Sequence, residues 1–444
     1  MILMYKRLLV FSLIFFLMIT AVSASNETSG SFSELQDIID SADEGSQINL
    51  TKDYVNDKGS EINIDKVLTI NGNSHVLDAK GKSGIFNIGS PVVLNDITFV
   101  NGNSQTGGVV LQTGGGEINN CTFKNNEAIY GGAVYQLGGK ITGCEFSSNN
   151  AKIDGGAVYQ LNGNITDSKF SSNSARYDGG AVYQEDSFIS SSEFRNNKVQ
   201  IQGGAVSQKN SEISDCVFTG NVAKSAGGAV HQEKSVVLNS VFTKNKVDYK
   251  IDKSSYWGGA VDQRDSVIYD STFIGNSAMY GGAVSSYMGN KIYNSLFINN
   301  KGIDGGAVFQ LESSLYNSTF QNNNAKHGGA VYQVEGNVFS STFTNNSAHE
   351  GGAIVQYSST TKDSTFTNNT AKYGGAIYTY ESHIINCTFS GNHADFGDDI
   401  YHLDEDVDFS EEDNPKVKIN THNQSGNPLG LLFISLVIPI IRKK

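Results

Sequence analysis

The segment CTFKNNEAIYGGAV at residues 121–134 decides the fold, because close copies of it recur along the chain. Gly-Gly pairs return every 23 or 24 residues from position 107 to position 374, apart from one 31-residue interval. A Phe, and an Asn three residues after it, keep the same period up to Phe389 and Asn392. Self-similarity at a fixed period predicts a solenoid, in which every repeat packs on its neighbours.

The composition removes several classes of function. The 444 residues carry a formal net charge of −13, so the chain repels phosphate, and we expect no nucleic-acid partner. Four cysteines without a Cys-x-x-Cys spacing predict neither a disulfide framework nor a zinc site. We expect no metal and no cofactor. The content of Phe and Tyr is high enough for a packed core and argues against disorder.

The repeat is too short for the common helical solenoids, which need about 33 residues or more per unit. Leucine-rich repeats have a compatible length, but here the columns are Phe, Val and Asn. Each unit divides into three short extended segments, such as residues 121–123, residues 132–136 and a third segment that contains Ile118, five residues before the Phe. We therefore predict an all-β fold, a right-handed single-stranded parallel β-helix with three strands in each coil of 23–24 residues.

Stacking of successive coils explains the columns. Phe above Phe forms an aromatic stack, Asn above Asn forms an amide ladder, and the Val and Gln of GGAVYQ share one inward face. Gly-Gly marks a corner that leaves no room for a Cβ, and the Asn or Asp three residues before each Phe suits a left-handed corner. The four Cys fall in one small column, which predicts burial. Cys121 and Cys144 lie on neighbouring coils, where parallel Cβ vectors disfavour a disulfide but leave it open.

The two ends of the chain carry different signals. Residues 1–24 combine a basic start, an apolar run and small residues, as in a secretory signal peptide, with an uncleaved anchor as the alternative. Residues 403–427 are predicted to be a polar spacer. Residues 428–444 are predicted to be a short hydrophobic anchor or sorting tail with a basic end, although the apolar run is shorter than a spanning helix. A soluble hydrophobic tail is the alternative.

The remaining sequence divides into a cap and a solenoid. Residues 25–44 are predicted to form an N-terminal cap with a short helix that closes the first coil. Phe32, Leu35, Ile38 and Ile39 have helical spacing, and Ser33 is the expected N-cap. Residues 45–402 are predicted to form the β-helix, with regular repeats from about residue 95.

Units such as 121–134 and CTFSGN at 387–392 resemble the repeats of chlamydial polymorphic membrane proteins, which pair Phe-x-x-Asn with Gly-Gly-Ala-Ile/Val. The whole arrangement resembles the adhesin-like surface proteins of methanogenic archaea, and the likeness covers about 95–427. We expect no counterpart of the autotransporter barrel in which the chlamydial proteins end, so the archaeal likeness fits better. It implies a pectin-lyase-like β-helix on the cell surface with an adhesive role.

One variable column holds most of the candidate site residues. The residue after each Ala-Val or Ala-Ile reads Tyr135, Tyr159, Tyr183, Ser207, His231, Asp262, Ser285, Phe309, Tyr332, Val355 and Tyr378. Its variability predicts that it faces outward. Ser207, His231 and Asp262 follow each other in the order of a catalytic relay, but no oxyanion hole is evident, so they are weak catalytic candidates.

Two further sets of residues are candidates for ligand binding. Tyr135, Tyr159 and Tyr183 would form an aromatic ladder suited to sugar rings or a protein partner, against ordinary β-rich surface. Trp257 closes the 31-residue interval and is a candidate because binding residues often lie on loops of a rigid scaffold. Asp154 and Asp178, one coil apart, and Asp304 are expected to be solvated corners rather than a catalytic pair.

These observations favour a non-enzymatic surface protein. We expect an adhesin-like or envelope protein, secreted and retained at the cell surface by a membrane-anchored tail, which binds a surface glycan or a protein of another cell. The alternative is a carbohydrate-active enzyme, a polysaccharide lyase or hydrolase, on the same scaffold.

Overall fold

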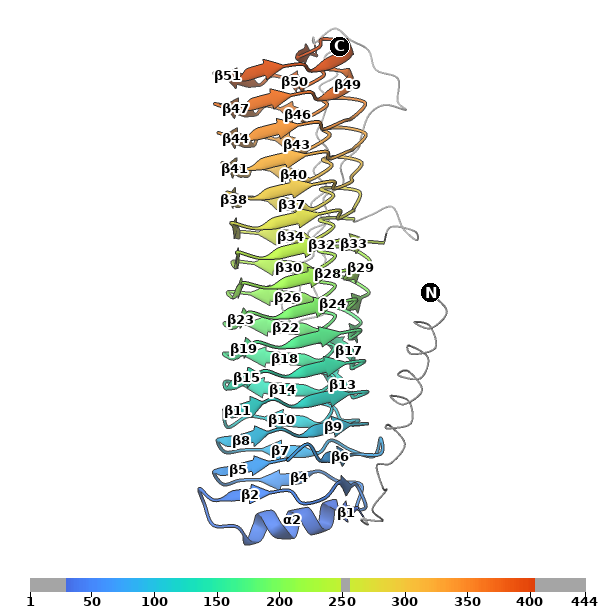
Figure 1. Cartoon of the computed structure of the whole chain (residues 1–444), viewed down its shortest axis with the longest axis vertical. Helices are drawn as coiled ribbons and strands as arrows, with labels where there is room; N and C mark the ends of the chain where they lie inside the picture. Colours follow the sequence, from blue (N-terminus) through green and yellow to red (C-terminus); the bar gives the residue numbers. More distant parts are fainter. Residues whose placement is uncertain (1–28, 249–255, 404–444) are drawn as a thin grey trace, which may run out of the picture.

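The computed structural model describes residues 29–248 and 256–403, and it confirms an all-β parallel solenoid. The coils stack into a straight rod with one helix across its N-terminal end (Figure 1). The predicted signal segment, polar spacer and hydrophobic tail lie outside the described residues. No helix within the described ranges is both long and apolar enough to cross a membrane.

One coil shows the plan of all the others. β12 (Thr122–Lys124) carries the Phe, β14 (Val134–Leu137) follows Gly-Gly, and β15 (Lys140–Thr142) carries the aliphatic residue. Equivalent strands of successive coils pair in parallel and in register, as in Phe123 with Phe146. Sheet A contains the β12 equivalents and has 16 strands, whereas sheet B, with β15, and sheet C, with β14, have 15 strands each.

The structure adds a fourth extended segment to the three that were predicted. β13 (Glu127–Tyr130) lies between the Asn ladder and Gly-Gly, and it begins a six-stranded ladder that ends at β33 (Lys246–Val247). Near the C-terminal end, β49 (Thr370–Tyr373) pairs with β53 (His393–Phe396) in the same position. Between them, single parallel bridges continue the ladder from coil to coil. This segment brings the residue before Gly-Gly over the outside of sheet C.

The interior columns are as predicted. Phe rings from Phe99 to Phe389 stack along the axis with centroids 4.6–5.1 Å apart. Asn221 donates its side-chain Nδ2 to Asn245 Oδ1 (3.0 Å) and to the Phe194 carbonyl (3.0 Å). Gln136, fully buried, donates to Gln160 Oε1 at 2.8 Å. These ladders pair most of the buried amides of the interior, whereas the Oε1 atoms of Gln112, Gln136 and Gln310 accept no hydrogen bond.

The corners between strands have the backbone conformations that the sequence predicts. Gly131 adopts a φ of +62°, and a Cβ on Gly132 would overlap the carbonyl oxygen of Gly156 on the next coil. Asn120, at the corner before sheet A, adopts a φ of +53°. Glycine at the first corner and Asn or Asp at the second therefore relieve backbone strain that most residues would suffer there.

The cysteines occupy the small column beside the Phe stack. Cys121, Cys144 and Cys216 are buried, whereas Cys387, in the last coil, is half-buried. All four are free thiols. The backbone N–H of Cys121 donates to Cys144 Sγ at 3.3 Å, so the neighbouring thiols sit side by side without a disulfide.

The N-terminal end is closed by α2 (Phe32–Ser41), which buries Phe32, Leu35 and Ile39 on the first coil. The predicted N-cap was wrong by two residues, because Ser31 Oγ accepts from the N–H of Glu34 at 3.0 Å. The helix begins early enough to bury Phe32 completely. Ile38 turns outward instead of joining the buried face and is 38% exposed.

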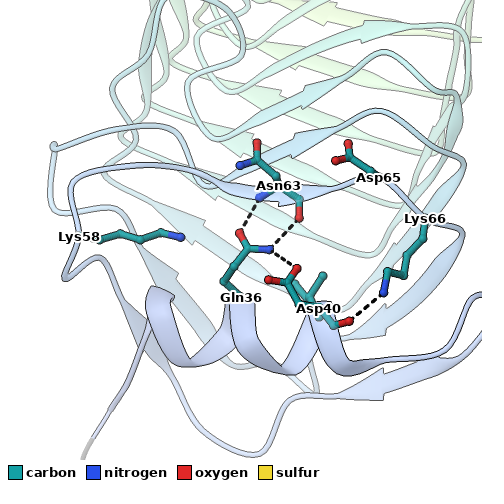
Figure 2. A pocket seen from close by; sticks show the side chains of 7 residues that line it. Gln36, Asp40, Lys58, Asn63, Asp65 and Lys66 are labelled. Atoms are coloured by element: carbon teal, nitrogen blue, oxygen red, sulfur yellow. Dashed lines mark hydrogen bonds between the residues drawn. The ribbon is translucent and has the colours of Figure 1, made fainter.

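Polar contacts complete this cap (Figure 2). Gln36 forms two hydrogen bonds with the backbone of Asn63, one through each atom of its amide, at 2.8 and 3.0 Å. Asn63 belongs to β4 (Ile62–Ile64), the first strand of sheet C. Lys66 Nζ donates to the carbonyls of Asp40 and Ala42 at the end of α2. The small pocket between helix and strand is thus part of the cap, and it covers an edge strand that would otherwise be free to pair.

Candidate functional site

The outer face of sheet C is covered along part of its length by the residue that precedes each Gly-Gly pair. We call these residues the rim column: Tyr130, Asp154, Asp178, Gln202, Ala226, Trp257, Tyr280, Asp304, His327, Glu350 and Tyr373. The variable column from Tyr135 to Tyr378 is called the outer column, and its members pair in register along sheet C.

The expectation that the whole outer column is exposed was wrong. Every member from Ser207 to Tyr378 is buried, whereas Tyr135, Tyr159 and Tyr183 are half-buried. Contacts with the rim column explain the burial, as in the ring of Tyr130, whose edge lies 5.6 Å from the ring of Tyr159. The residue type in the outer column therefore varies for two reasons: the rim residue that contacts it differs from coil to coil, and its exposure to solvent differs as well.

The three tyrosines do form the predicted ladder. The ring centroids of Tyr135 and Tyr159 are 5.0 Å apart, and those of Tyr159 and Tyr183 are 4.7 Å apart, with the planes nearly parallel. Burial, reinforced by the neighbouring phenol, raises the pKa of Tyr159. Because each ring lies against the next, the ring faces are used within the ladder. The surface left open consists of ring edges and hydroxyls rather than flat platforms.

The relay candidates are brought together only in part. His231 Nδ1 lies 2.9 Å from Asp262 Oδ2, in an environment where both side chains are nearly buried. The second oxygen of Asp262 accepts from Ser285 on the following coil. Burial raises the pKa of Asp262, but His231 and the other donors outweigh it, so the net pKa lies below its ordinary value. Ser207 neighbours His231 along the sheet, yet no hydrogen bond joins them in the described part of the chain.

The aspartates of the rim are not solvated corners, which corrects the sequence-based expectation. Asp154 and Asp178 are half-buried, and the N–H of Asp178 donates to Asp154 Oδ1 at 3.0 Å. Burial, together with the charge of Asp178, raises the pKa of Asp154 to about 7. Burial also raises the pKa of Asp178 to about 6, against the opposing influence of His231.

Asp304 is even more enclosed. It is 1% exposed, and its Oδ1 lies 2.6 Å from Nδ1 of His327, which is 3% exposed. The other ring nitrogen of His327 is buried without a hydrogen-bond partner. The sequence pattern does not reveal this dyad, because a residue before Gly-Gly has no periodic apolar signal that would indicate burial.

Trp257 is buried, contrary to its expected place on a binding loop. It is 5% exposed and stacks on Tyr280 with the ring centroids 4.3 Å apart. Its ring also meets the edges of Tyr287 and Phe309 at 5.0 and 5.5 Å. These residues belong to a second apolar compartment outside sheet C, whose other buried members are Ala226, Leu311, Tyr332, Val334, Val355 and Tyr378. Trp257 therefore stabilises this cover.

A family model matches part of the repeat region. The model of the Chlamydia polymorphic membrane protein repeat matches residues 215–233, 340–355 and 363–380. The fold and these repeats define a parallel β-helix protein with polymorphic-membrane-protein-type repeats. No curated protein matches the chain.

Solved structures share the architecture at low identity. The A-module of mannuronan C-5 epimerase AlgE4 from Azotobacter vinelandii is 12% identical, with a TM-score of 0.38, over 86% of this chain and 97% of that one. PfbA, a surface adhesin of Streptococcus pneumoniae, is 13% identical, with a TM-score of 0.34, over 82% and 91%. At TM-scores below 0.5 these likenesses carry no conclusion about this chain.

Proposed function

We propose that this chain is a non-enzymatic adhesin-like or envelope protein of the cell surface, related to the adhesin-like proteins of methanogenic archaea. In this proposal the chain is secreted through residues 1–24 and retained at the membrane by residues 428–444. The stiff rod would then present its outer faces to a glycan or a protein of another cell. The polymorphic-membrane-protein-type repeats support this role.

One observation carries the location of the binding surface. Along the outer column, the tyrosine ladder at Tyr135, Tyr159 and Tyr183 stays half-open, whereas the rim closes the later coils. Burial raises the pKa of the Tyr159 phenol, and Asp154 and Glu185 lie close enough to raise it further. Glu185 Oε1 accepts from Lys209 Nζ at 2.8 Å. Such a row of donors and acceptors suits the hydroxyls of an extended glycan or the basic groups of a protein, because no pocket closes over it.

The test compares two matched triple variants of the full chain on a glycan array and on target cells. Replacing Tyr135, Tyr159 and Tyr183 with Ser should abolish binding. The control replaces Tyr269, Tyr293 and Tyr316, three stacked tyrosines on sheet B, with Ser. The chain is coupled at low density so that avidity does not contribute, and the control should then bind like the parent. Equal loss in both variants, or none in the first, would contradict the proposal.

A second candidate function is supported by the carboxylate pair. Asp154 and Asp178 have pKa values of about 7 and about 6 and lie one coil apart on the edge of the tyrosine ladder. A carbohydrate-active enzyme would need such a pair for general acid–base work. Incubating the full chain with acidic and neutral polysaccharides would reveal new reducing ends or unsaturated products. Activity that disappears in Asp178→Asn but persists in the exposed-corner control Asp167→Asn would establish this alternative.

A further inference from the structure

The outer face of sheet B carries a second ladder, which runs the whole length of the rod. The residues that follow the buried aliphatic of each strand pair in register as Asn49, Asn71, Asn95, Asn119, Thr142, Thr166, Ser190, Ser214, Leu238, Tyr269, Tyr293, Tyr316, Phe339, Lys362 and Ile385. We call this set the sheet B column. It begins with the amide and hydroxyl residues from Asn49 to Ser214, called its amide half. The apolar residues from Leu238 to Phe339, which are aromatic except for Leu238, are called its aromatic half, and Lys362 and Ile385 follow them.

Both halves are ordered and open to solvent. Asn71 donates to Asn49 at 2.9 Å, and Asn119 donates to Asn95 at 3.1 Å. In the aromatic half the ring centroids of Tyr269 and Tyr293 are 5.0 Å apart, and those of Tyr293 and Tyr316 are 4.8 Å apart. Asn49, Lys362 and Ile385 are exposed and the other members of the column are half-buried, and no rim covers them in the described coils.

The stacking limits what can bind there. Tyr293 and Tyr316 have neighbouring rings on both sides, so their faces are not available to a sugar ring. The column instead offers ring edges and polar tips that repeat once per coil, at the strand spacing of about 4.8 Å. A partner that contacts the column in every coil must present its own groups at the same spacing. A second copy of this rod does so.

The strand positions of the face are themselves close to neutral. The chain as a whole carries −13, which opposes association of like molecules. The two outward positions of the sheet B strands nevertheless hold only three lysines, Lys140, Lys291 and Lys362, and two glutamates, Glu117 and Glu212, a formal charge of +1. Exposed Phe188, at 56%, adds apolar surface to this face. At the corner to sheet A, residues of the column are each followed by an exposed aspartate, namely Asp96, Asp167, Asp215, Asp270 and Asp363. These aspartates and Lys362, which would face its own counterpart, must stay hydrated at the edge of the interface.

The size of the face is sufficient when its full length is used. Fifteen strands at about 4.8 Å give about 70 Å, and three-residue strands give a width of about 10 Å. The resulting area, about 700 Å² per copy, approaches the roughly 800 Å² that each partner contributes to a standard interface. The aromatic half alone covers about a third of this area, so an offset or antiparallel pairing buries much less of like against like.

We propose that two copies of this chain associate side by side and in parallel through the sheet B column, aromatic half against aromatic half. Such an interface is isologous, with a two-fold axis along the rod, so each residue of the column approaches its own counterpart. A parallel pair also suits two molecules that are anchored in the same membrane, as in the proposed function. This association is independent of any ligand at the tyrosine ladder of sheet C.

Sedimentation of the full chain in mild detergent tests the association. The parent should form dimers, and Tyr293→Glu with Tyr316→Glu should weaken dimerisation about tenfold or more, because it places like charges opposite each other. The control, Thr342→Glu with Thr365→Glu, adds the same charge to exposed positions on neighbouring strands of sheet A and should leave the dimer intact. Circular dichroism and the milder Tyr293→Thr with Tyr316→Thr pair separate loss of the interface from loss of folding. A monomeric parent, or a dimer insensitive to the sheet B glutamates, would overturn the proposal.

Cross-linking tests the orientation. Ser214→Cys and Thr142→Cys, made singly in a chain whose four native cysteines are replaced by Ser, lie near the middle and in the amide half of the column. A parallel two-fold pair should give a homodimeric disulfide at both positions. Thr342→Cys on sheet A should give none. Cross-linking equally efficient on sheet A and sheet B would show random collision and would refute the interface.

Discussion

The inner and outer faces of sheet C are built by the same strands, yet their side chains follow different rules. The inner face repeats Val and Gln in nearly every coil, because each position packs on its own copy in the next coil. The outer face changes from tyrosines to a polar group around His231 and Asp262, and then to the apolar compartment around Phe309. The inward positions therefore keep the same residue types from coil to coil, whereas the outward positions vary with the rim residue that packs over them.

The largest expected effect separates the interior of the coils, represented by the Phe stack of sheet A, from the outer face of sheet C. Phe218→Ala, inside the aromatic stack, should lower the free energy of unfolding by about 3–5 kcal/mol, because it leaves a cavity between fully buried rings. Tyr159→Ala, in the half-buried ladder of the outer column, should cost about 1 kcal/mol. Denaturant unfolding of the two variants measures the difference. Equal losses would mean that the outer column is core and would remove the distinction.

The amide ladder should give the next largest effect. Asn221→Leu should cost roughly 1–3 kcal/mol, because the Phe194 carbonyl and the neighbouring amides lose their partners. The matched variant Asn164→Leu changes an exposed Asn at the start of a sheet B strand and should stay within about 0.5 kcal/mol of the parent. An unchanged unfolding midpoint for Asn221→Leu would contradict a structural role for the ladder.

These contrasts show what the sequence could predict. The Phe and Asn columns were predictable because a side chain that stacks on its own copy must recur with the period of the coil. The corner at Gly131 was predictable because left-handed backbone and close packing both select glycine. The capping helix was found from its apolar spacing, and its N-cap was missed because Ser31 and Ser33 offer the same chemistry two residues apart.

The candidate site was predicted less well, for a physical reason. A column covered by a rim needs a complementary partner in each coil rather than a constant residue, so it varies as an exposed column does. Trp257 and Asp154 were therefore assigned to loop and solvent, although both contact the outer column or its neighbours. A signal did exist, because the rim becomes aromatic at Trp257 and Tyr280 shortly before the outer column becomes aromatic at Phe309.

A smaller effect concerns the pH dependence of the rim. The pKa of Asp154 rises from an ordinary 3.8 to about 7 in the folded chain. Between these values the unfolded chain has lost a proton that the folded chain keeps, so stability should fall as the pH rises through this window. Asp154→Asn should remove this loss, by about 1–2 kcal/mol above pH 7 after allowance for the exposed part of the side chain. Unfolding midpoints measured across the pH range should show a flatter profile for this variant than for the exposed-corner control Asp167→Asn.

The smallest expected effect decides which serine belongs to the buried polar group. Ser285 is fully buried and donates to Asp262, so Ser285→Ala leaves a carboxylate oxygen short of one donor and should cost about 1 kcal/mol. Ser207→Ala removes a hydroxyl that does not bond His231 and should change the unfolding midpoint very little. If Ser207 instead acted as a nucleophile, its replacement would abolish any hydrolysis measured with the parent while Ser285→Ala retained it. A stability loss confined to Ser285→Ala, with no activity lost in Ser207→Ala, would make His231, Asp262 and Ser285 a structural network beneath the rim.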